Sequence, residues 1–299
     1  MSAGPMSMHL RLGMLLALLA GPVAGETPAT CDALVGAVES LTGLRVSAPP
    51  ASAADGWCVL DGARLTGDRA PQTSVERLRL AGTEAEGELL SMEIDGAGLR
   101  MRPALNDSDM PGWLRDLMRL QSAEVHLRIS RDAAADRLVL EDGRLGLSGG
   151  GELLVTAGIA GARLSAPSML TGRVTTLHLE WRNDGRTLRP VMEALGAEVD
   201  SQATGTQAVL AARAALLRVV EALPEASLPE AAAEALAGFV AELPQGRGRL
   251  VLDFGSEVGI GAVQIGLLAL ADDPLSPEAL ARLFAGSVIG ASWQPGLAP

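Results

Sequence analysis

The chain contains neither lysine nor tyrosine, and only three of its 299 residues are histidines. Without lysine, the protein can have no Schiff-base or P-loop lysine and no Ser-Lys dyad. Without tyrosine, it can have no tyrosine nucleophile. These absences exclude several classes of covalent and phosphoryl-transfer enzyme before any motif is considered.

Positive charge is also scarce. The chain has 24 basic residues against 36 acidic residues, and its formal net charge is −12. An acidic surface repels the phosphates of nucleic acids and anionic lipid headgroups, so it disfavours both as electrostatic partners. We expect no nucleic-acid partner and interpret the charge as a solubilising surface.

The few cysteines indicate an oxidising compartment. Cys31 and Cys58 are the only pair, and such a pair is typical of a disulfide in an exported protein. The bond is expected to tie a first helix, Cys31 to about Leu41, to a first strand that begins near Trp57. The alternative is a redox-active pair, which usually needs the closer C-x-x-C spacing.

The N-terminus has the pattern of a secretory signal peptide. Arg11 precedes the apolar run Leu12 to Leu19, and Gly21-Pro22 and small residues follow it. We expect residues 1–25 to be cleaved, which leaves a single periplasmic domain over residues 26–299 without an integral membrane span. A retained anchor or a cytosolic start is the alternative.

Alternation of apolar and polar residues is the dominant pattern after the leader. In Glu124 to Ile129 and in Thr175 to Arg182, every second side chain is apolar, which predicts a sheet with one buried and one wet face. Five Asp-Gly dipeptides are typical of tight turns. Strands are expected near 57–66, 74–80, 88–102, 123–130, 137–142, 144–148, 152–160, 173–183, 249–254, 261–269 and 287–293, with a bulge or turn at Gly96 and Gly98.

Helices are expected between some of these strands. One follows the capping residues Asp107 to Asp109, and one begins at Ser276. The insert 187–243 is expected to hold a helix that Gly196 stops, a helix over 206–223, and a helix begun by a capping box at Ser227 to Glu230. The predicted fold is α+β: a curved antiparallel meander with an inserted Ala-rich helical hairpin and a disulfide-tied N-terminal helix.

Two motifs point only weakly to catalysis. Gly146 to Gly150 matches the nucleophile-elbow pattern G-x-S-x-G, but a strand, not a helix, is expected after it, so a hairpin loop is the simpler interpretation. The glycine-rich segment Gly255 to Gly266 lacks the third glycine of a dinucleotide-binding loop. We expect no cofactor.

The remaining polar candidates are His126 and His178, with Glu124 and Glu180 beside them on the polar faces of two strands. Adjacent strands would let these side chains converge as an acid/base pair or as a two-histidine, one-carboxylate metal site. A solvated face with cross-strand ion pairs is the alternative.

Apolar surface is the last candidate. The Leu-, Val- and Ala-rich helices of residues 187–243, beside a curved sheet, could enclose an elongated groove that takes an acyl chain. The alternative is an ordinary core.

Three segments, Asp55 to Leu60, Trp181 to Arg186 and Asp272 to Leu275, resemble those of uncharacterised secreted proteins from Rhodobacter-like alphaproteobacteria. The succession of hairpins, an Ala/Leu-rich helical insert and a returning strand is also similar to envelope proteins of the AsmA and YdgA type. That second resemblance implies a role in outer-membrane biogenesis or lipid handling. The chain lacks the great length of those proteins, and the resemblance carries over no catalytic residue.

Together these patterns predict a non-catalytic periplasmic protein that binds a hydrophobic, lipid-like ligand or an envelope component. A structural or assembly module that binds another protein through its sheet edge is the second hypothesis. A hydrolase is the third.

Overall fold

The computed structural model describes residues 26–49, 52–67, 71–102, 115, 118, 121–185, 188–270, 273 and 275–296. The expected signal peptide and most of the helix expected after Asp107 lie outside the described residues. Of that helix, Arg115 and Met118 are described as helical, and Met118 is buried.

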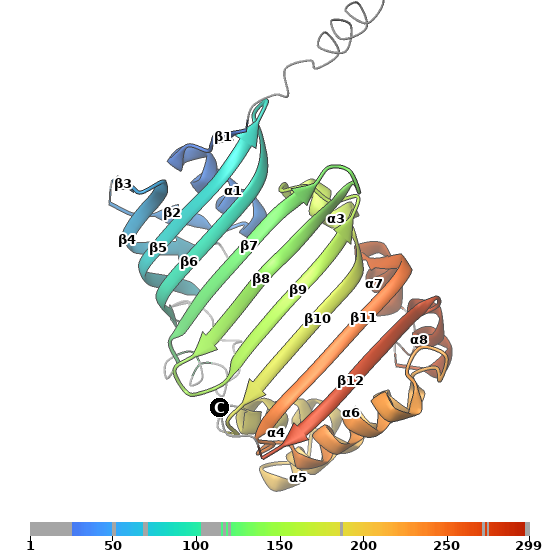
Figure 1. Ribbon diagram of the computed structural model, residues 1–299. Helices are drawn as coiled ribbons and strands as arrows, with labels where there is room; N and C mark the ends of the chain where they lie inside the picture. The colour runs from blue at the N-terminus through green and yellow to red at the C-terminus, as the bar shows by residue number, and fades with distance from the viewer. Residues whose placement is uncertain are drawn as a thin grey trace, which may run out of the picture.

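One antiparallel sheet of twelve strands forms the body of the molecule. From β4 to β12 each strand pairs with its neighbour in the chain, as Figure 1 shows, which confirms the expected meander. The sheet is open and curved, and β1 and β3 lie off the main path, paired with β5 and β4. The strands are β1 (Thr27–Pro28), β2 (Arg45–Ser47), β3 (Ser52–Ala54), β4 (Trp57–Thr66), β5 (Gln72–Ala85), β6 (Glu88–Arg102), β7 (Ala123–Asp132), β8 (Arg137–Leu147), β9 (Glu152–Ala160), β10 (Arg173–Asn183), β11 (Gly248–Gly261) and β12 (Ser287–Pro295).

Strand register gives the sheet two chemically different faces. A row of paired positions on the apolar face reads Leu60, Leu78, Gly96, Val125, Leu145, Leu153, Trp181, Leu250 and Trp293. The next row, on the polar face, reads Val59, Arg79, Asp95, His126, Arg144, Leu154, Glu180, Val251 and Ser292. The alternation in the sequence therefore extends across nine strands as one continuous apolar face.

Most of the described helices pack against the sheet, either at its first strands or at its last strands. The described helices are α1 (Cys31–Thr42), α3 (Ala166–Thr171), α4 (Leu188–Val199), α5 (Thr206–Ala222), α6 (Glu230–Glu242), α7 (Ala262–Ala269) and α8 (Pro277–Leu283). Figure 1 shows α1 beside the first strands and α4 to α6 beside the last strands.

The N-terminal cluster joins α1 to the first strands. Leu34 and Val38 of α1 are buried with Leu80 and Met92 of the sheet. The Cys31–Cys58 disulfide, with its Cα atoms 5.2 Å apart, connects the same two elements and confirms the expected bond. Thr30 caps the helix through its hydroxyl oxygen, which accepts a hydrogen bond from the Ala33 N–H at 3.2 Å.

The C-terminal cluster joins the helical insert to the last strands. Phe239 of α6 packs edge-on against Trp181 and Trp293, with ring centroids 5.7 and 5.0 Å away. Met192 of α4 and Val209 of α5 are buried in the same cluster. The insert therefore covers β10 to β12, while α1 covers β4 to β6.

Asp142-Gly143 is not a turn, so the two strands expected at 137–142 and 144–148 are one strand, β8. The pairing register shifts around these residues on both sides of β8, as at a β-bulge. Gly143 is buried, and a Cβ atom there would lie 3.0 Å from the Val155 carbonyl oxygen. The glycine serves close strand packing instead of chain reversal. The bulge expected near Gly96 is confirmed by the register shift between Gly96 and Leu99.

Two expectations for the helical insert were wrong. Gly196 does not stop α4 but lies inside it, where a Cβ atom would meet the Ala208 carbonyl oxygen of α5 at 1.7 Å. This glycine lets the two helices approach closely. The capping box at Ser227 is absent, because the Ser227 hydroxyl donates to the Phe284 carbonyl at 3.0 Å and Pro229 occupies the N-cap position of α6.

The strand expected over 261–269 is also wrong. β11 continues to Gly261, and helix α7 follows directly. A short apolar run does not distinguish a strand from a helix by its periodicity. The helix begins where the Gly261 N–H donates to the Gln264 side-chain oxygen at 3.1 Å.

Candidate functional site

A hollow of about 430 Å³ opens on the apolar face between the two clusters. We call it the sheet hollow; Leu145, Leu147, Gly151, Glu152, Leu153, Leu179, Trp181, Leu250 and Leu252 line it. Its volume falls within the range of about 300 to 1,000 Å³ that is usual for small-molecule sites.

Four neighbouring strands, β8 to β11, supply the lining of the sheet hollow. Leu145 and Leu153 are direct cross-strand partners, as are Leu179 and Leu252. Their side chains are only partly buried, in contrast to Leu250, which the C-terminal cluster covers. Trp181 belongs both to the hollow and to that cluster, so the hollow borders the part of the sheet that the helical insert covers.

Among the described residues, Glu152 is the one charged residue that lines the sheet hollow. Its carboxylate is paired with Arg182 at 3.0 Å. The remaining lining is almost wholly hydrocarbon. The described lining suits a hydrocarbon chain and holds no cation for an acidic headgroup.

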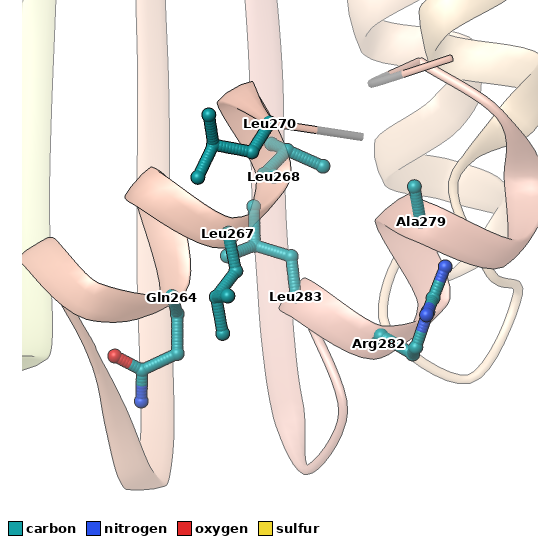
Figure 2. Close-up of a pocket in the computed structure, with 7 residues that line it drawn as sticks. All are labelled: Gln264, Leu267, Leu268, Leu270, Ala279, Arg282 and Leu283. Carbon is teal, nitrogen blue, oxygen red and sulfur yellow. The ribbon is translucent and has the colours of Figure 1, made fainter. Parts of the chain in front are cut away.

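A second hollow, of about 490 Å³, lies between α7 and α8. Figure 2 shows leucine side chains of both helices lying between them, with Arg282 on the α8 side. The Arg282 guanidinium donates to the Glu278 carbonyl at 3.2 Å. This hollow is formed by two short helices, whereas strands of the sheet form the sheet hollow.

The polar face carries an ion network around His126. Its Nδ1 lies 2.6 Å from Asp95 Oδ1, and its Nε2 lies 3.8 Å from Asp142 Oδ2 and 4.0 Å from Glu93 Oε1. Each of these carboxylates also pairs with an arginine: Asp95 with Arg79, Asp142 with Arg144 and Glu93 with Arg128. The Arg144 guanidinium holds the pKa of Asp142 below its usual value, against the opposing effect of burial. The network is therefore internally neutralised.

His178 makes a separate pair with Asp253, with Nδ1 and Oδ1 2.7 Å apart. Strands β8 and β9 lie between His126 on β7 and His178 on β10. Three strand spacings correspond to roughly 14 Å, far beyond the reach of a shared proton or a shared metal ion. The structure places both imidazoles on the polar face but does not bring them together.

The two candidate glutamates have different surroundings. Glu124 is exposed on β7 and lines an open depression of about 410 Å³ with His126. Glu180 is only 5% exposed and pairs with Arg182 at 2.7 Å and with Arg249. Hydrogen bonds from Arg249, and then from Arg182, lower the pKa of Glu180, although burial opposes the shift.

The G-x-S-x-G motif lies in the hairpin between β8 and β9. Ser148 Oγ accepts a hydrogen bond from the Ser122 N–H at 2.9 Å, and the Gly149 N–H donates to Gln121 at 2.8 Å. A strand follows the motif, so the strand-turn-helix geometry of a nucleophile elbow is not formed here. The glycine-rich segment Gly255 to Gly266 spans the end of β11 and the start of α7.

Sequence reasoning placed the acyl-chain groove along the helices and missed the sheet hollow. Its residues belong to the expected strands, and their alternation identified them as apolar-face positions. Which of those positions a helix covers depends on where each helix packs, and periodicity carries no signal for that.

Within the described ranges, no group of three or more His, Cys, Asp or Glu residues could hold a metal ion. Nor does any helix in the described part of the chain combine the length and apolar character needed to cross a membrane. A scan of protein-family models and a search of curated proteins each found no match to this chain.

Proposed function

We propose that this protein is a non-catalytic periplasmic binding protein that holds the hydrocarbon part of a lipid-like ligand in the sheet hollow. One observation carries the proposal: leucines of four adjacent strands line an open hollow on the apolar face, and Trp181 forms its wall. An exported protein with a disulfide fits an oxidising compartment, and the leader pattern fits the same route.

Burial of a hydrocarbon chain supplies the binding energy. Each buried methylene contributes about 0.8 kcal/mol, so ten methylenes contribute about 8 kcal/mol. Loss of translational and rotational freedom offsets at least about 4 kcal/mol of this gain. We therefore expect a moderate affinity, with the polar headgroup left in solvent beside the hairpin that contains Gly151.

Native mass spectrometry of protein recovered from the bacterial periplasm tests the proposal. The expected result is a species heavier than the protein chain by the mass of one amphiphile, which organic extraction removes and releases in identifiable form. A species with the mass of the chain alone, together with an extract free of lipid, would contradict it.

A second candidate is protein binding at the open edge of the sheet. β12 ends the strand order and has β11 as its one hydrogen-bonded strand neighbour among the described strands. An edge strand can accept an added strand from a partner. Covalent crosslinking in the periplasm separates the two candidates, because a crosslinked envelope protein with no bound lipid supports the edge.

A further inference from the structure

Helix α7 is apolar yet exposed on most of its circumference. Its segment from Ala262 to Leu270 has no charged residue. Val263 is 71% exposed and Leu270 is 84% exposed, and Ile265 and Leu267 are also more than half exposed. A helix without a polar face is normally buried, so these side chains need a partner that removes them from water.

Helix α3 extends the same surface. It contacts α7 and exposes Met169 and Leu170. We define the α3–α7 patch as Met169, Leu170, Val263, Ile265, Leu267 and Leu270. Large apolar residues that gather on neighbouring helices mark an interaction surface.

The patch lies at one end of the strands. α3 connects β9 to β10 and α7 follows β11, and Arg173 at the start of β10 pairs with both Ala160 and Gly261. Figure 1 shows α3 and α7 at the same end of the sheet. The helical insert follows the opposite end of β10.

The N-terminal strand enters the sheet at the patch end. Thr27 and Pro28 of β1 pair with Glu84 and Thr83, just before the β5–β6 turn. Twenty-five residues precede Glu26, and they contain the apolar run Leu12 to Leu19. In the chain, this apolar run of the expected leader precedes the strand that enters the sheet at the same end as the α3–α7 patch.

We propose that the α3–α7 patch inserts into the surface of a lipid bilayer. The patch offers protruding leucine, isoleucine and valine side chains, and a helix of eight residues is about 12 Å long, short enough to lie in the plane of the interface. The net charge of −12 opposes attraction to anionic headgroups. Insertion of the apolar side chains therefore drives the contact, and anionic lipid does not strengthen it.

This surface is distinct from the sheet hollow, so the two proposals fail separately. The hollow holds one molecule inside the fold, whereas the patch places one end of the fold against many lipids. A ligand-binding protein positioned in this way would receive or deliver its ligand at the bilayer surface.

Flotation with vesicles of palmitoyl-oleoyl phosphatidylcholine tests the patch. The variant Val263→Glu/Leu270→Glu changes the two most exposed residues of the α3–α7 patch, one in α7 and one at its C-cap, where folding depends least on the side chain. The matched control is Val199→Glu/Leu210→Glu, which changes two exposed apolar residues of α4 and α5. Thermal unfolding confirms that both variants fold, and Leu270→Ser serves if the double variant does not.

We expect wild-type protein and the control variant to float with the vesicles, also in about 0.5 M salt, where charge interactions are screened. We expect the partition coefficient of Val263→Glu/Leu270→Glu to fall at least about tenfold, because each lost side chain contributed apolar burial. Wild-type protein that does not float, or an α7 variant that floats as well as wild type, would overturn the proposal. The proposal would also be overturned if wild-type protein forms dimers without vesicles and the α7 variant does not, because the patch would then bind a second copy of the chain.

Discussion

Glu180 is a carboxylate that the sheet buries between two guanidinium groups. Arg182 and Arg249 each donate to it, and both arginines remain partly exposed. Its lowered pKa means that the folded protein binds fewer protons than the unfolded chain near pH 4. The stabilisation is therefore present above the unfolded-state pKa of about 4.3 and is lost as the pH falls through the lower folded-state pKa.

Glu180→Gln should lower the free energy of unfolding at pH 7 by about 1 to 3 kcal/mol, because a neutral amide replaces the buried, charged acceptor of two arginines. The difference from wild type should shrink as the pH falls below about 4. Urea unfolding at a series of pH values measures this. Glu152→Gln is the control, since its exposed pair with Arg182 contributes about 0 to 1 kcal/mol. Equal effects of the two variants at pH 7 would contradict the buried role of Glu180.

Gly196 is the residue that sets the approach of α4 to α5. Gly196→Ala places a methyl group against the Ala208 backbone, so we expect it to lower the free energy of unfolding by about 1 to 3 kcal/mol. Gly36→Ala in α1 is the matched control, because nothing lies within 4 Å of its added Cβ atom. That control should raise stability by roughly 0.5 to 1 kcal/mol through helix propensity. Thermal unfolding of both variants gives the comparison, and a stabilised Gly196→Ala protein would contradict the close approach.

At the scale of single residues, the sequence predicted which face of the sheet a side chain lies on, but not which residue it pairs with. Alternation placed His126, His178, Glu124 and Glu180 on the polar face. Their partners, such as Asp95 and Asp253, lie 31 and 75 residues away in the chain. The strand order and register determine those pairs, and neither can be read from a local sequence pattern.

The disulfide acts at the scale of elements, since it fastens α1 to β4. Cys31→Ser/Cys58→Ser opens a covalent link between residues 27 positions apart. On the chain-entropy model this costs about 3 to 4 kcal/mol. We expect urea unfolding of wild type in the presence of reductant to match that of the double variant. A variant as stable as the oxidised wild type would show that packing of Leu34 and Val38 alone holds the helix.

Helices and strands were predicted well where the periodic pattern of apolar residues was long, and poorly where it was short. The meander followed from long alternating segments joined by short connections, which favour antiparallel neighbours. The apolar run after Gly261 fits a strand or a helix equally well, and a local hydrogen bond to Gln264 accompanies the helix. The turn expected at Gly143 and the helix end expected at Gly196 were wrong for a related reason. Both glycines allow close packing, although glycine often ends a helix or strand.

At the scale of the whole molecule, a single sheet carries α1 beside its first strands and α4 to α6 beside its last strands (Figure 1). The strand register gives this sheet one apolar and one polar face. The N-terminal and C-terminal clusters cover the two ends of the apolar face. The sheet hollow is the part of that face where leucines remain open between them. The sequence predicts an apolar face that helices cover, but the location of the gap depends on the packing of helices far apart in the chain.

The central claim is that the sheet hollow holds a hydrocarbon chain, and filling the hollow tests it most directly. Leu153→Trp adds an indole to the hollow, whereas Thr156→Trp adds the same group to an exposed position on the polar side of β9. Native mass spectrometry of the two periplasmic proteins measures the fraction that carries an amphiphile. We predict that Leu153→Trp binds the amphiphile at least about tenfold more weakly, which corresponds to a loss of about 1.4 kcal/mol, and that it carries a clearly lower fraction of ligand than wild type, while Thr156→Trp keeps the wild-type fraction. Equal loading of both variants would contradict the claim.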